Sequence, residues 1–540
     1  MTLCMLAGAF LGLFLFLAFA NRQSAPQTPP TALIAARRPW LGDAVSFGTV
    51  VFFYSLLLLA INRFWSATLL GAGLIVLLWA GNRLKAAILS EVLVFSDVFL
   101  AGHALRYPRL YFGYAPAWIW PLLAFACGIG LWGMSAEEPF DGLDGAKRLA
   151  LIVLFAALLI GVGRALSRPI TWVKRWLSRF PLSFDPQTDA WAYTPLGAAL
   201  LHLLWHGQHR EELRRHFFFS GKACERTQGR HEAADHKLLI QAESFVPLHK
   251  LLDRPSSTPT IDDLLQKADS GRLNLDWRGA YTMRTEFAVL TGIAPRSLET
   301  YGFDPYRLAA MMPMESLAWV MKRRGYRTVV CHPNDGRFFE RFRVMRHLGF
   351  DEFIDLERLL AQWPEMKSAD AYCGRYVSDK ALLAWASAYL SAAKAPTFLF
   401  VITMEAHGPW DKAKFPGAQS LTEEERYEVH LNHLDQGVAS LLKAQSEGLD
   451  ASVLMYGDHL PGLHLLRGMT PPIPSRTWWV AWSSLGRGKQ SAERDLAPER
   501  LGRRWTQPCE GLMQDRLSPA KRLSSNAAVA ARGRRLKPKR

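Results

Sequence analysis

Cysteine is scarce in this chain, which contains 6 in 540 residues. These cysteines are scattered along the sequence and show neither the paired spacing of a disulfide framework nor the close spacing of a metal site. They stand at positions 4, 127, 224, 331, 373 and 509. A fold held together by disulfides is therefore not expected, and cysteine usage does not identify the compartment.

Charged residues are sparse up to about residue 165 and frequent beyond it. Five apolar segments in this first part are long enough, or nearly long enough, to cross a bilayer. They run over 1–20, 44–61, 64–81, 115–134 and 147–165. Their central stretches hold no ionisable residue, whereas a transporter usually places such residues inside several spans. The pattern predicts a transmembrane α-helical bundle over 1–165 that anchors the protein.

Two apolar stretches need separate interpretation. The first segment lacks both the basic start and the clear cleavage site of a signal peptide, so we interpret it as a retained span. The stretch 84–112 is apolar but contains charged residues, which favours an interfacial or re-entrant piece over a sixth span. These residues are Glu91, Asp97, Arg106 and Arg109.

The net charge of +16 is compatible with nucleic acid, an anionic membrane surface or an acidic substrate. No nucleic-acid motif is present, and the apolar segments favour the membrane. The basic, amphipathic stretch 166–236 is expected to act as a linker on the headgroup surface. Loop 21–45 contains three arginines, whereas 135–146 is acidic. The positive-inside rule therefore draws loop 21–45, and with five spans the large domain too, towards the cytoplasm.

Beyond residue 236 short apolar runs alternate with helical patterns, which predicts an α/β domain over 237–485 with a mainly parallel sheet flanked by helices. The expected strands are 238–242, 328–331, 397–403 and 452–456. The expected helices are 261–268, 305–324, 339–348, 378–392 and 422–445. The final stretch, 486–540, is strongly basic and rich in turn residues, so we expect a largely disordered tail.

A carboxylate or an imidazole follows each of the four expected strands. Glu243 and His332 come directly after two of them, His407 follows the third, and Asp458-His459 follows the fourth. Ligands of open α/β sheets bind outside the carboxyl ends of the strands. One such histidine would be unremarkable, but four strands together predict a shared polar site. Its donors suit Mg²⁺, Mn²⁺ or Zn²⁺.

Such a site needs a nucleophile, and Thr282 is the best candidate. It precedes a helical pattern that continues through Leu290. A hydroxyl at a helix N-terminus lies in the positive field of the helix, which also favours a bound phosphoryl group. From the local pattern alone, the favoured interpretation is a threonine that only caps the helix.

Together these residues resemble the sulfatase-like branch of the alkaline phosphatase superfamily, and more closely the lipoteichoic acid synthases and osmoregulated-glucan phosphoglycerol transferases. The resemblance covers about residues 45–480. It is most specific in 242–245 (Ala-Glu-Ser-Phe), in 282–292 (Thr, then Glu-Phe and Leu-Thr-Gly) and in 457–459 (Gly-Asp-His). It implies one divalent metal ion, Mn²⁺ or Mg²⁺ before Zn²⁺, and Thr282 as nucleophile. The implied metal ligands are Glu243, Thr282, Asp458 and His459.

The resemblance also implies a site for the substrate headgroup. His332, Phe339 and Arg341 match the spacing of the headgroup motif, and Phe339 stands where close relatives often have Trp. His407, in His-Gly-Pro-Trp, matches a later family histidine. It is expected to bind substrate and to exchange a proton with the leaving group or the acceptor.

The implied function is a metal-dependent membrane transferase. It would move a phosphoglycerol-type headgroup from a membrane phospholipid to a cell-envelope glycan through a phosphothreonine intermediate. The acceptor could be teichoic acid, periplasmic glucan or capsule. Family members work outside the bacterial cytoplasmic (inner) membrane, so we expect an extracytoplasmic catalytic domain, against the charge of loop 21–45.

Three alternatives remain. A sulfatase, or sulfuric-ester hydrolase, would need a Cys/Ser-x-Pro-x-Arg motif, and none occurs near Thr282. A phosphoethanolamine transferase is closer, although such enzymes often carry periplasmic disulfides. A non-catalytic membrane sensor or assembly factor with a retained fold is disfavoured by the intact metal and nucleophile residues, although the atypical C-terminus keeps it open.

Overall fold

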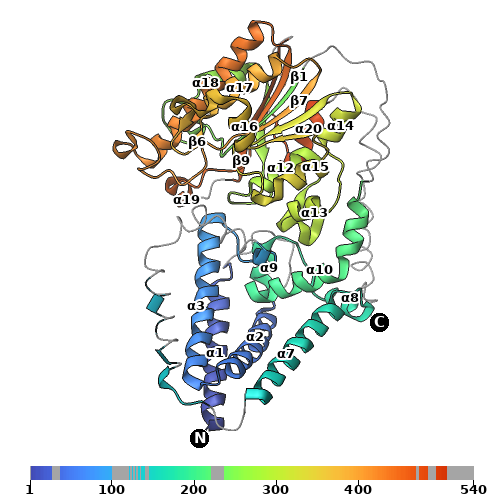
Figure 1. Cartoon of the computed structure of the whole chain (residues 1–540), viewed down its shortest axis with the longest axis vertical. Helices are drawn as coiled ribbons and strands as arrows, with labels where there is room; N and C mark the ends of the chain where they lie inside the picture. Colours follow the sequence, from blue (N-terminus) through green and yellow to red (C-terminus); the bar gives the residue numbers. More distant parts are fainter. Residues whose placement is uncertain are drawn as a thin grey trace, which may run out of the picture.

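The structure is a computed structural model. It describes residues 2–26, 37–99, 145–219, 236–469, 474–484 and 494–506, together with scattered positions between 121 and 139. A group of long helices lies at one end and an α/β domain at the other, with α8 to α10 between them (Figure 1). The expected fold class, an apolar helical part followed by an α/β domain with a mainly parallel sheet, is confirmed.

Within the described residues, four long helices make up the apolar part. They are α1 (Thr2–Gln23), α2 (Pro39–Ile61), α3 (Phe64–Leu89) and α7 (Gly145–Leu166). Among the described residues, three segments are long and apolar enough to cross a membrane: Cys4–Gln23, Pro39–Ile61 and Phe64–Ala86. This count is below the five expected spans. The expected span 115–134 falls mostly outside the described residues, and 147–165 corresponds to α7.

Three helices connect the apolar part to the α/β domain: α8 (Thr171–Leu177), α9 (Pro186–Tyr193) and α10 (Pro195–Phe217). They share a small apolar core that includes Leu177, Tyr193 and Leu201. The long helix α10 also contacts the α/β domain, where His206 Nδ1 lies 3.0 Å from Thr300 Oγ1. The stretch expected to be a surface linker is therefore helical over 171–217 apart from short breaks.

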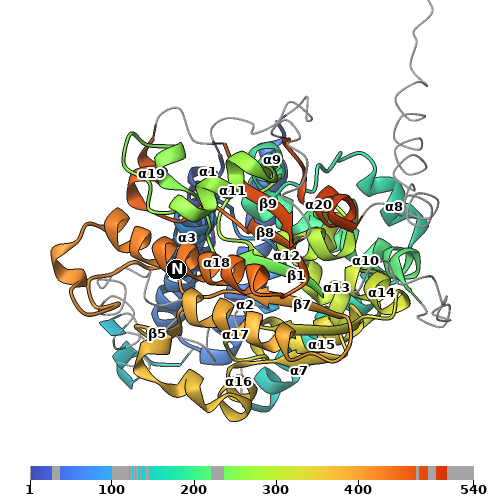
Figure 2. The same ribbon diagram turned by 90° about the horizontal axis from the view of Figure 1, so that it is seen from above.

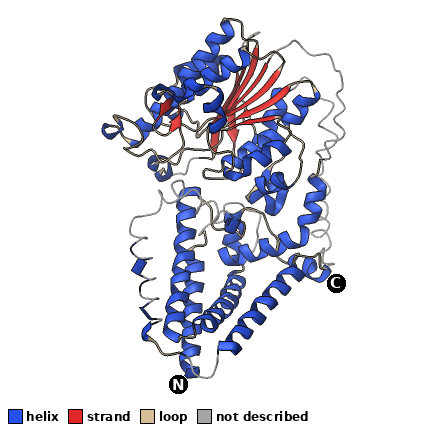
Figure 3. Cartoon of the chain, in the orientation of Figure 1, coloured by secondary structure: helices blue, strands red, loops and turns tan. Residues whose placement is uncertain are grey.

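The central sheet has seven strands in the order β2-β9-β8-β1-β7-β3-β4 (Figure 3). Neighbours from β8 to β4 run parallel, whereas β9 is antiparallel to both β8 and β2. In chain order the strands are β1 His236–Ala242, β2 Asp269–Asn274, β3 Arg327–Cys331, β4 Glu352–Ile354, β7 Thr397–Ile402, β8 Ala451–Gly457 and β9 Arg476–Ser483. Two short strands, β5 (Tyr372–Cys373) and β6 (Tyr376–Val377), pair with each other as a separate antiparallel hairpin.

Helices cover both faces of the sheet, which explains why β7 (Thr-Phe-Leu-Phe-Val-Ile) is buried along its whole length. Alternate side chains of β1 point to opposite cores. One face packs against α11 (Pro259–Lys267), α16 (Leu356–Gln362), α17 (Asp379–Ser391) and α18 (Glu423–Ser446). The other packs against α12 (Thr282–Thr291), α13 (Pro305–Met311), α14 (Leu317–Arg323), α15 (Arg341–His347) and α20 (Pro498–Thr506). Figure 2 shows α17 and α18 across the strands from α13 and α14.

Two expectations about helices differ from the structure. The helix expected over 305–324 is two helices, α13 and α14, because Pro313 interrupts the run and Ser316 caps the second helix through the Trp319 N–H. The folded part also continues past residue 485, where the basic tail was expected to begin. Leu501 of α20 is fully buried in the same core as α12.

The end of α3 lies directly against the α/β domain. In the loop before α12, Gly279 has a positive φ of 77°, and a Cβ at this position would lie 2.1 Å from the carbonyl oxygen of Leu89, the last residue of α3. Only glycine fits so close an approach between two backbones. The end of the third apolar helix is thus packed against the loop that leads into α12.

Candidate active site

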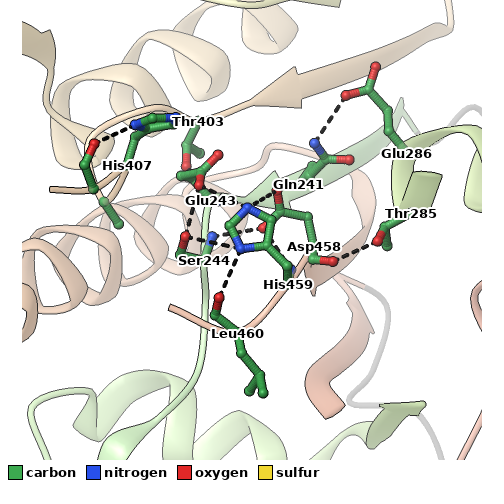
Figure 4. A network of polar contacts seen from close by, with 12 residues as sticks. Gln241, Glu243, Ser244, Thr285, Glu286, Thr403, His407, Asp458, His459 and Leu460 are labelled. Atoms are coloured by element: carbon green, nitrogen blue, oxygen red, sulfur yellow. Dashed lines mark hydrogen bonds and ion pairs between the residues drawn. The ribbon is translucent and has the colours of Figure 1, made fainter. Parts of the chain in front are cut away.

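Glu243, Asp458 and His459 come together at the carboxyl ends of the adjacent parallel strands β1 and β8. Their ligand atoms all lie within 4.8 Å of one another. His459 Nε2 is 3.3 Å from Glu243 Oε1 and 3.4 Å from Asp458 Oδ2, and all three residues are buried (Figure 4). The strand-end pattern of the sequence thus corresponds to one compact group of oxygen and nitrogen donors.

Ser244 organises this group from the turn that ends β1. It has a positive φ of 54°, an unusual conformation for a residue other than glycine. In this conformation its backbone N–H donates to Asp458 Oδ1 (2.7 Å) and its hydroxyl donates to Glu243 Oε1 (2.8 Å). The backbone N–H of Glu243 donates in turn to Thr403 Oγ1 (3.0 Å), at the end of the neighbouring strand β7. The turn after β1 therefore holds both carboxylates, and the end of β7 fixes the Glu243 backbone.

The charges in this group are poorly balanced. Burial and the Glu243 carboxylate raise the pKa of Asp458 to about 7. Burial opposes ionisation of Glu243, but the adjacent His459 outweighs it and lowers the pKa of Glu243 to about 2. His459 behaves similarly: burial is outweighed by the two carboxylates, which raise its pKa to about 9. Two buried carboxylates compete for one imidazole, so positive charge is in deficit.

A divalent cation fits this group on structural grounds. His459 Nδ1 donates to the carbonyl oxygen of Leu460 (3.0 Å), so in the neutral ring the Nε2 lone pair faces the two carboxylates. Three electron-rich atoms then converge, and Asp458 Oδ2 is buried without a hydrogen bond of ordinary geometry. The donor set of two carboxylates and one imidazole suits Mn²⁺, Mg²⁺ or Zn²⁺.

Thr282 lies beside these residues as the first residue of α12. Its hydroxyl is close enough to Asp458 to lower the pKa of that carboxyl through a hydrogen bond. The expected N-cap role is wrong, because Tyr281 occupies the cap position and Thr282 is already helical. One turn further on, the Thr285 hydroxyl donates to the Asp458 carbonyl oxygen (2.6 Å) and fixes α12 against the end of β8. The Thr282 hydroxyl thus lies at the positive end of a ten-residue helix.

Arg341 and His332 form a second buried group nearby. Arg341 Nη1 lies 2.9 Å from His332 Nε2, and Arg341 Nη2 donates to Glu286 Oε2 (3.2 Å). Burial and Arg341 hold the pKa of His332 well below its usual range, so the ring is neutral and accepts the arginine N–H. Tyr306 also donates its hydroxyl to Glu286. The guanidinium is therefore held in one orientation, and its Nε has no hydrogen-bond partner among the described residues.

Phe339 lies above this arginine in a strained turn. Phe339 and Glu340 have φ values of 55° and 53°, and the Phe339 ring centroid is 5.8 Å from the Arg341 guanidinium carbon. Two successive left-handed residues without glycine cost free energy, and such strain is concentrated at functional sites. The aromatic and the arginine of the expected headgroup motif are thus adjacent in space.

In Figure 4, His407 lies on the opposite side of Glu243 from Asp458. Its Nδ1 donates to the carbonyl oxygen of Gly408 (2.7 Å), which leaves Nε2 as the atom that can accept a proton. Burial lowers the pKa of His407 although the Glu243 carboxylate opposes the shift, so the ring is neutral near neutral pH. The structure thus places a neutral base close to the Glu243–Asp458–His459 group.

Sequence reasoning did not identify several residues that organise the site. Ser244 donates to both carboxylates, and Thr403 accepts from the backbone N–H of Glu243. Glu286 accepts from Arg341. Ser244 and Glu286 lie inside the matched motifs, and this position in the sequence could have identified them as site residues. Thr403 had no signal of its own, because its role depends on the pairing of β1 with β7.

Comparison with known proteins agrees with the expected resemblance. The sulfatase family model matches residues 236–494. The capsular polysaccharide biosynthesis protein RkpI of Rhizobium meliloti (strain 1021) is 28% identical over 411 residues, which cover 73% of this chain and 72% of that protein. A second protein of that organism, named for cyclic beta-1,2-glucan modification, is 27% identical over 254 residues. These cover 44% of this chain and only 38% of that protein.

Similar chains are also found among solved structures. The lipoteichoic acid synthase LtaP from Listeria monocytogenes has a TM-score of 0.40 and 17% identity, covering 54% of this chain and 75% of that chain. The phosphoglycerol transferase GacH from Streptococcus pyogenes, in complex with sn-glycerol-1-phosphate, has a TM-score of 0.39 and 20% identity, covering 54% and 77%.

Proposed function

We propose that this chain, whose residues 236–494 match the sulfatase family model, is a phospholipid-headgroup transferase that acts on a cell-envelope glycan. The donor headgroup is of the phosphoglycerol type, and transfer proceeds through phosphorylated Thr282. The catalytic domain lies outside the cytoplasmic membrane, and α1 to α3 anchor it.

One observation carries this proposal: the Thr282 hydroxyl at the N-terminus of α12 lies beside Asp458, which belongs to the Glu243–Asp458–His459 group. A helix N-terminus favours both an ionised hydroxyl and a phosphoryl group. A cation held by Glu243, Asp458, His459 and Thr282 would neutralise phosphoryl oxygens and favour loss of the Thr282 proton. The hydroxyl is thus placed as a nucleophile towards phosphorus.

In the first step a bond forms between Thr282 Oγ and the headgroup phosphorus, and the bond from phosphorus to the diacylglycerol oxygen breaks. The proton lost by Thr282 ends on the diacylglycerol oxygen. Arg341, held by Glu286, presents guanidinium N–H groups that suit the headgroup or its phosphate. Phe339 offers an apolar face beside them.

In the second step a glycan hydroxyl attacks the same phosphorus, and the bond to Thr282 Oγ breaks. Neutral His407, with Nε2 available, takes the proton from the acceptor hydroxyl, and Thr282 Oγ recovers a proton. The names of the relatives, one in capsular polysaccharide biosynthesis and one in cyclic glucan modification, support a glycan as acceptor.

The position of the site supports a membrane lipid as donor. Glu91, which follows α3 directly, accepts hydrogen bonds from Tyr281 and Arg284 on either side of Thr282. Since α3 is apolar and long enough to cross a bilayer up to Ala86, the nucleophile lies close to the end of a span. A headgroup at the membrane surface is the nearest substrate for such a site.

The test is release of diacylglycerol from phosphatidylglycerol and, in a parallel arm, from phosphatidylethanolamine. Thr282→Ala should abolish release, because no other hydroxyl occupies the first position of α12. Thr291→Ala is the matched control, since its hydroxyl bonds only within the C-terminal end of the same helix. Release by Thr282→Ala at the wild-type rate would refute the mechanism. Release only from phosphatidylethanolamine would show that the donor headgroup is phosphoethanolamine and not phosphoglycerol.

A further inference from the structure

A second cluster of metal-ligand side chains lies beyond the site described above. We name Cys373, Glu405, His430 and His433 the Cys373 cluster. Three of its members, Cys373, Glu405 and His433, offer ligand atoms within 4.8 Å of one another. His430 joins them, with Nδ1 2.8 Å from Glu405 Oε1 and 3.7 Å from Cys373 Sγ. Cys373, Glu405 and His430 are buried, and the His433 side chain is 30% exposed.

Three separate elements bring the cluster together. Cys373 lies on the β5–β6 hairpin, Glu405 follows β7, and the two histidines stand three residues apart on α18. Positions i and i+3 of a helix share one face, so both imidazoles point the same way. The cluster therefore joins the β5–β6 hairpin, the end of β7 and α18.

Hydrogen bonds alone do not account for this arrangement. Both His430 Nδ1 (2.8 Å) and His433 Nδ1 (2.6 Å) approach the same oxygen, Glu405 Oε1. His430 Nδ1 has a single in-plane position, either an N–H or a lone pair, yet the carboxylate oxygen and the thiol both converge on it. Two ring nitrogens and a sulfur thus lie near one carboxylate oxygen, and donors of this kind suit a cation.

The spacing and the donor types indicate the cation. Bond lengths of about 2.0–2.3 Å around tetrahedral Zn²⁺ place neighbouring ligand atoms roughly 3.3–3.8 Å apart. The measured separations of 2.6–3.7 Å match a site that contracts slightly when its members hydrogen-bond to one another. Sulfur and imidazole favour zinc, whereas Mg²⁺ and Ca²⁺ prefer oxygen alone.

We propose that the Cys373 cluster is a second metal site that holds Zn²⁺ through Cys373, Glu405, His430 and His433. Binding displaces the thiol proton of Cys373 to solvent, and both histidines bind as neutral imidazoles. Four protein ligands close the coordination shell, which is typical of a structural zinc site. The inference does not depend on the proposed transfer reaction.

The site would fix the loop that carries His407. Glu405 is two residues before His407, and Lys414 Nζ donates to the backbone oxygens of both. On the other side, the Asp379 backbone N–H donates to Glu405 Oε2 (2.7 Å) at the start of α17. Zinc at the Cys373 cluster would therefore act as a positioning element for the candidate proton-transfer histidine.

The experiment measures metal content and cobalt spectra of the full-length protein purified in detergent. Wild type should hold two metal ions per chain, and His433→Gln should hold one. In Co²⁺-loaded protein a sulfur-to-cobalt charge-transfer absorption should appear, because only the Cys373 cluster contains sulfur. Cys373→Ser should remove this absorption, whereas Cys331→Ala, which changes another buried free cysteine, should keep it.

Asp458→Asn separates the two sites. This variant should lose the ion at the Glu243–Asp458–His459 group and keep the sulfur-to-cobalt absorption of the Cys373 cluster. Failure of one site can therefore be distinguished from failure of the other. A single ion in wild type that Asp458→Asn removes would overturn the proposal. An absorption that survives Cys373→Ser would do the same. The metal content and the cobalt spectrum of the wild-type protein test the proposal even if a variant does not fold.

Discussion

Arg284 donates from Nη2 to both carboxylate oxygens of Glu91, each at 3.1 Å, although the residues are 193 positions apart in the chain. Glu91 follows the apolar helix α3, and Arg284 is two residues after Thr282. Both side chains are buried, with 4% and 5% of their surface exposed. The candidate nucleophile is thus connected to the membrane part by a buried ion pair.

Loss of one partner from this pair should be costly. Burial would raise the pKa of Glu91, but Arg284 and Lys85 outweigh it and hold the pKa below its usual value. Glu91→Gln leaves the buried Arg284 charge without its hydrogen-bonded carboxylate, so we expect a loss of about 3–5 kcal/mol in unfolding free energy. We also expect a fall in kcat, because Thr282 is displaced. Thermal unfolding and diacylglycerol release measure the two effects.

Two further variants act as controls. The double variant Glu91→Gln/Arg284→Met should recover part of the lost stability, because no buried charge remains unpaired. Asp276→Asn, in the exposed pair with Arg296, should cost less than about 1 kcal/mol. Equal, small effects at both pairs would show that the ion pair does not couple the two parts.

Arg341 should be intolerant even of lysine. Arg341→Lys cannot keep the contacts with His332 and Glu286 at once, and each charged hydrogen bond is worth about 1.5–3 kcal/mol. We therefore expect kcat/KM for the phospholipid to fall roughly 10–100-fold. Arg343→Lys is the matched control, because Arg343 is exposed and pairs only with Glu340. An unchanged kcat/KM in Arg341→Lys would contradict a role for Arg341 in substrate binding.

Metal removal should both inactivate and destabilise the protein. Chelation should abolish diacylglycerol release, and added Mn²⁺ should restore it. An ion at about 100 times its dissociation constant adds about 2.7 kcal/mol of stability. Because the pKa of Asp458 is raised to about 7 in the metal-free site, protons compete with the ion, and the gain should shrink as the pH falls below 7. Asp458→Asn should show no gain from Mn²⁺, and an equal gain would locate the ion elsewhere.

His206 should make the attachment of α10 sensitive to acid. Burial, with Arg307 and Arg210 nearby, lowers the pKa of His206 to about 4. A depressed histidine pKa means that the folded state binds fewer protons, so stability falls as the pH drops from about 6.5 to about 4. The loss is at most about 3 kcal/mol, at 1.36 kcal/mol per pKa unit. The melting temperature of wild type should fall more steeply over this range than that of His206→Gln. Parallel curves would contradict the assignment.

The sequence predicted the sheet and its polar edge well, because both depend on local patterns. The four buried runs became β1, β3, β7 and β8, and the residues after them face one edge. The two edge strands, β2 and β4, and the second strand, β9, were not predicted. In β2, Asp-Ser-Gly-Arg-Leu-Asn has little β propensity, and its strand conformation depends on pairing with β9.

Contacts between distant residues were beyond sequence reasoning. Glu91 was one of several charges in an apolar stretch, and nothing local indicated Arg284 as its partner. Cys373 and His433 likewise showed no ligand spacing, because 60 positions separate them and only the packing of the β5–β6 hairpin against α18 brings them together. Long-range pairs of this kind are set by topology and not by periodicity.

The most direct test of the central claim is mass spectrometry of the peptide that contains Thr282, after purified protein is incubated with phosphatidylglycerol and no acceptor. The account predicts a glycerol-phosphate adduct on Thr282 in stoichiometric relation to released diacylglycerol, and no adduct in Asp458→Asn. Diacylglycerol release with Thr282 unmodified, or an adduct on another residue, would contradict it.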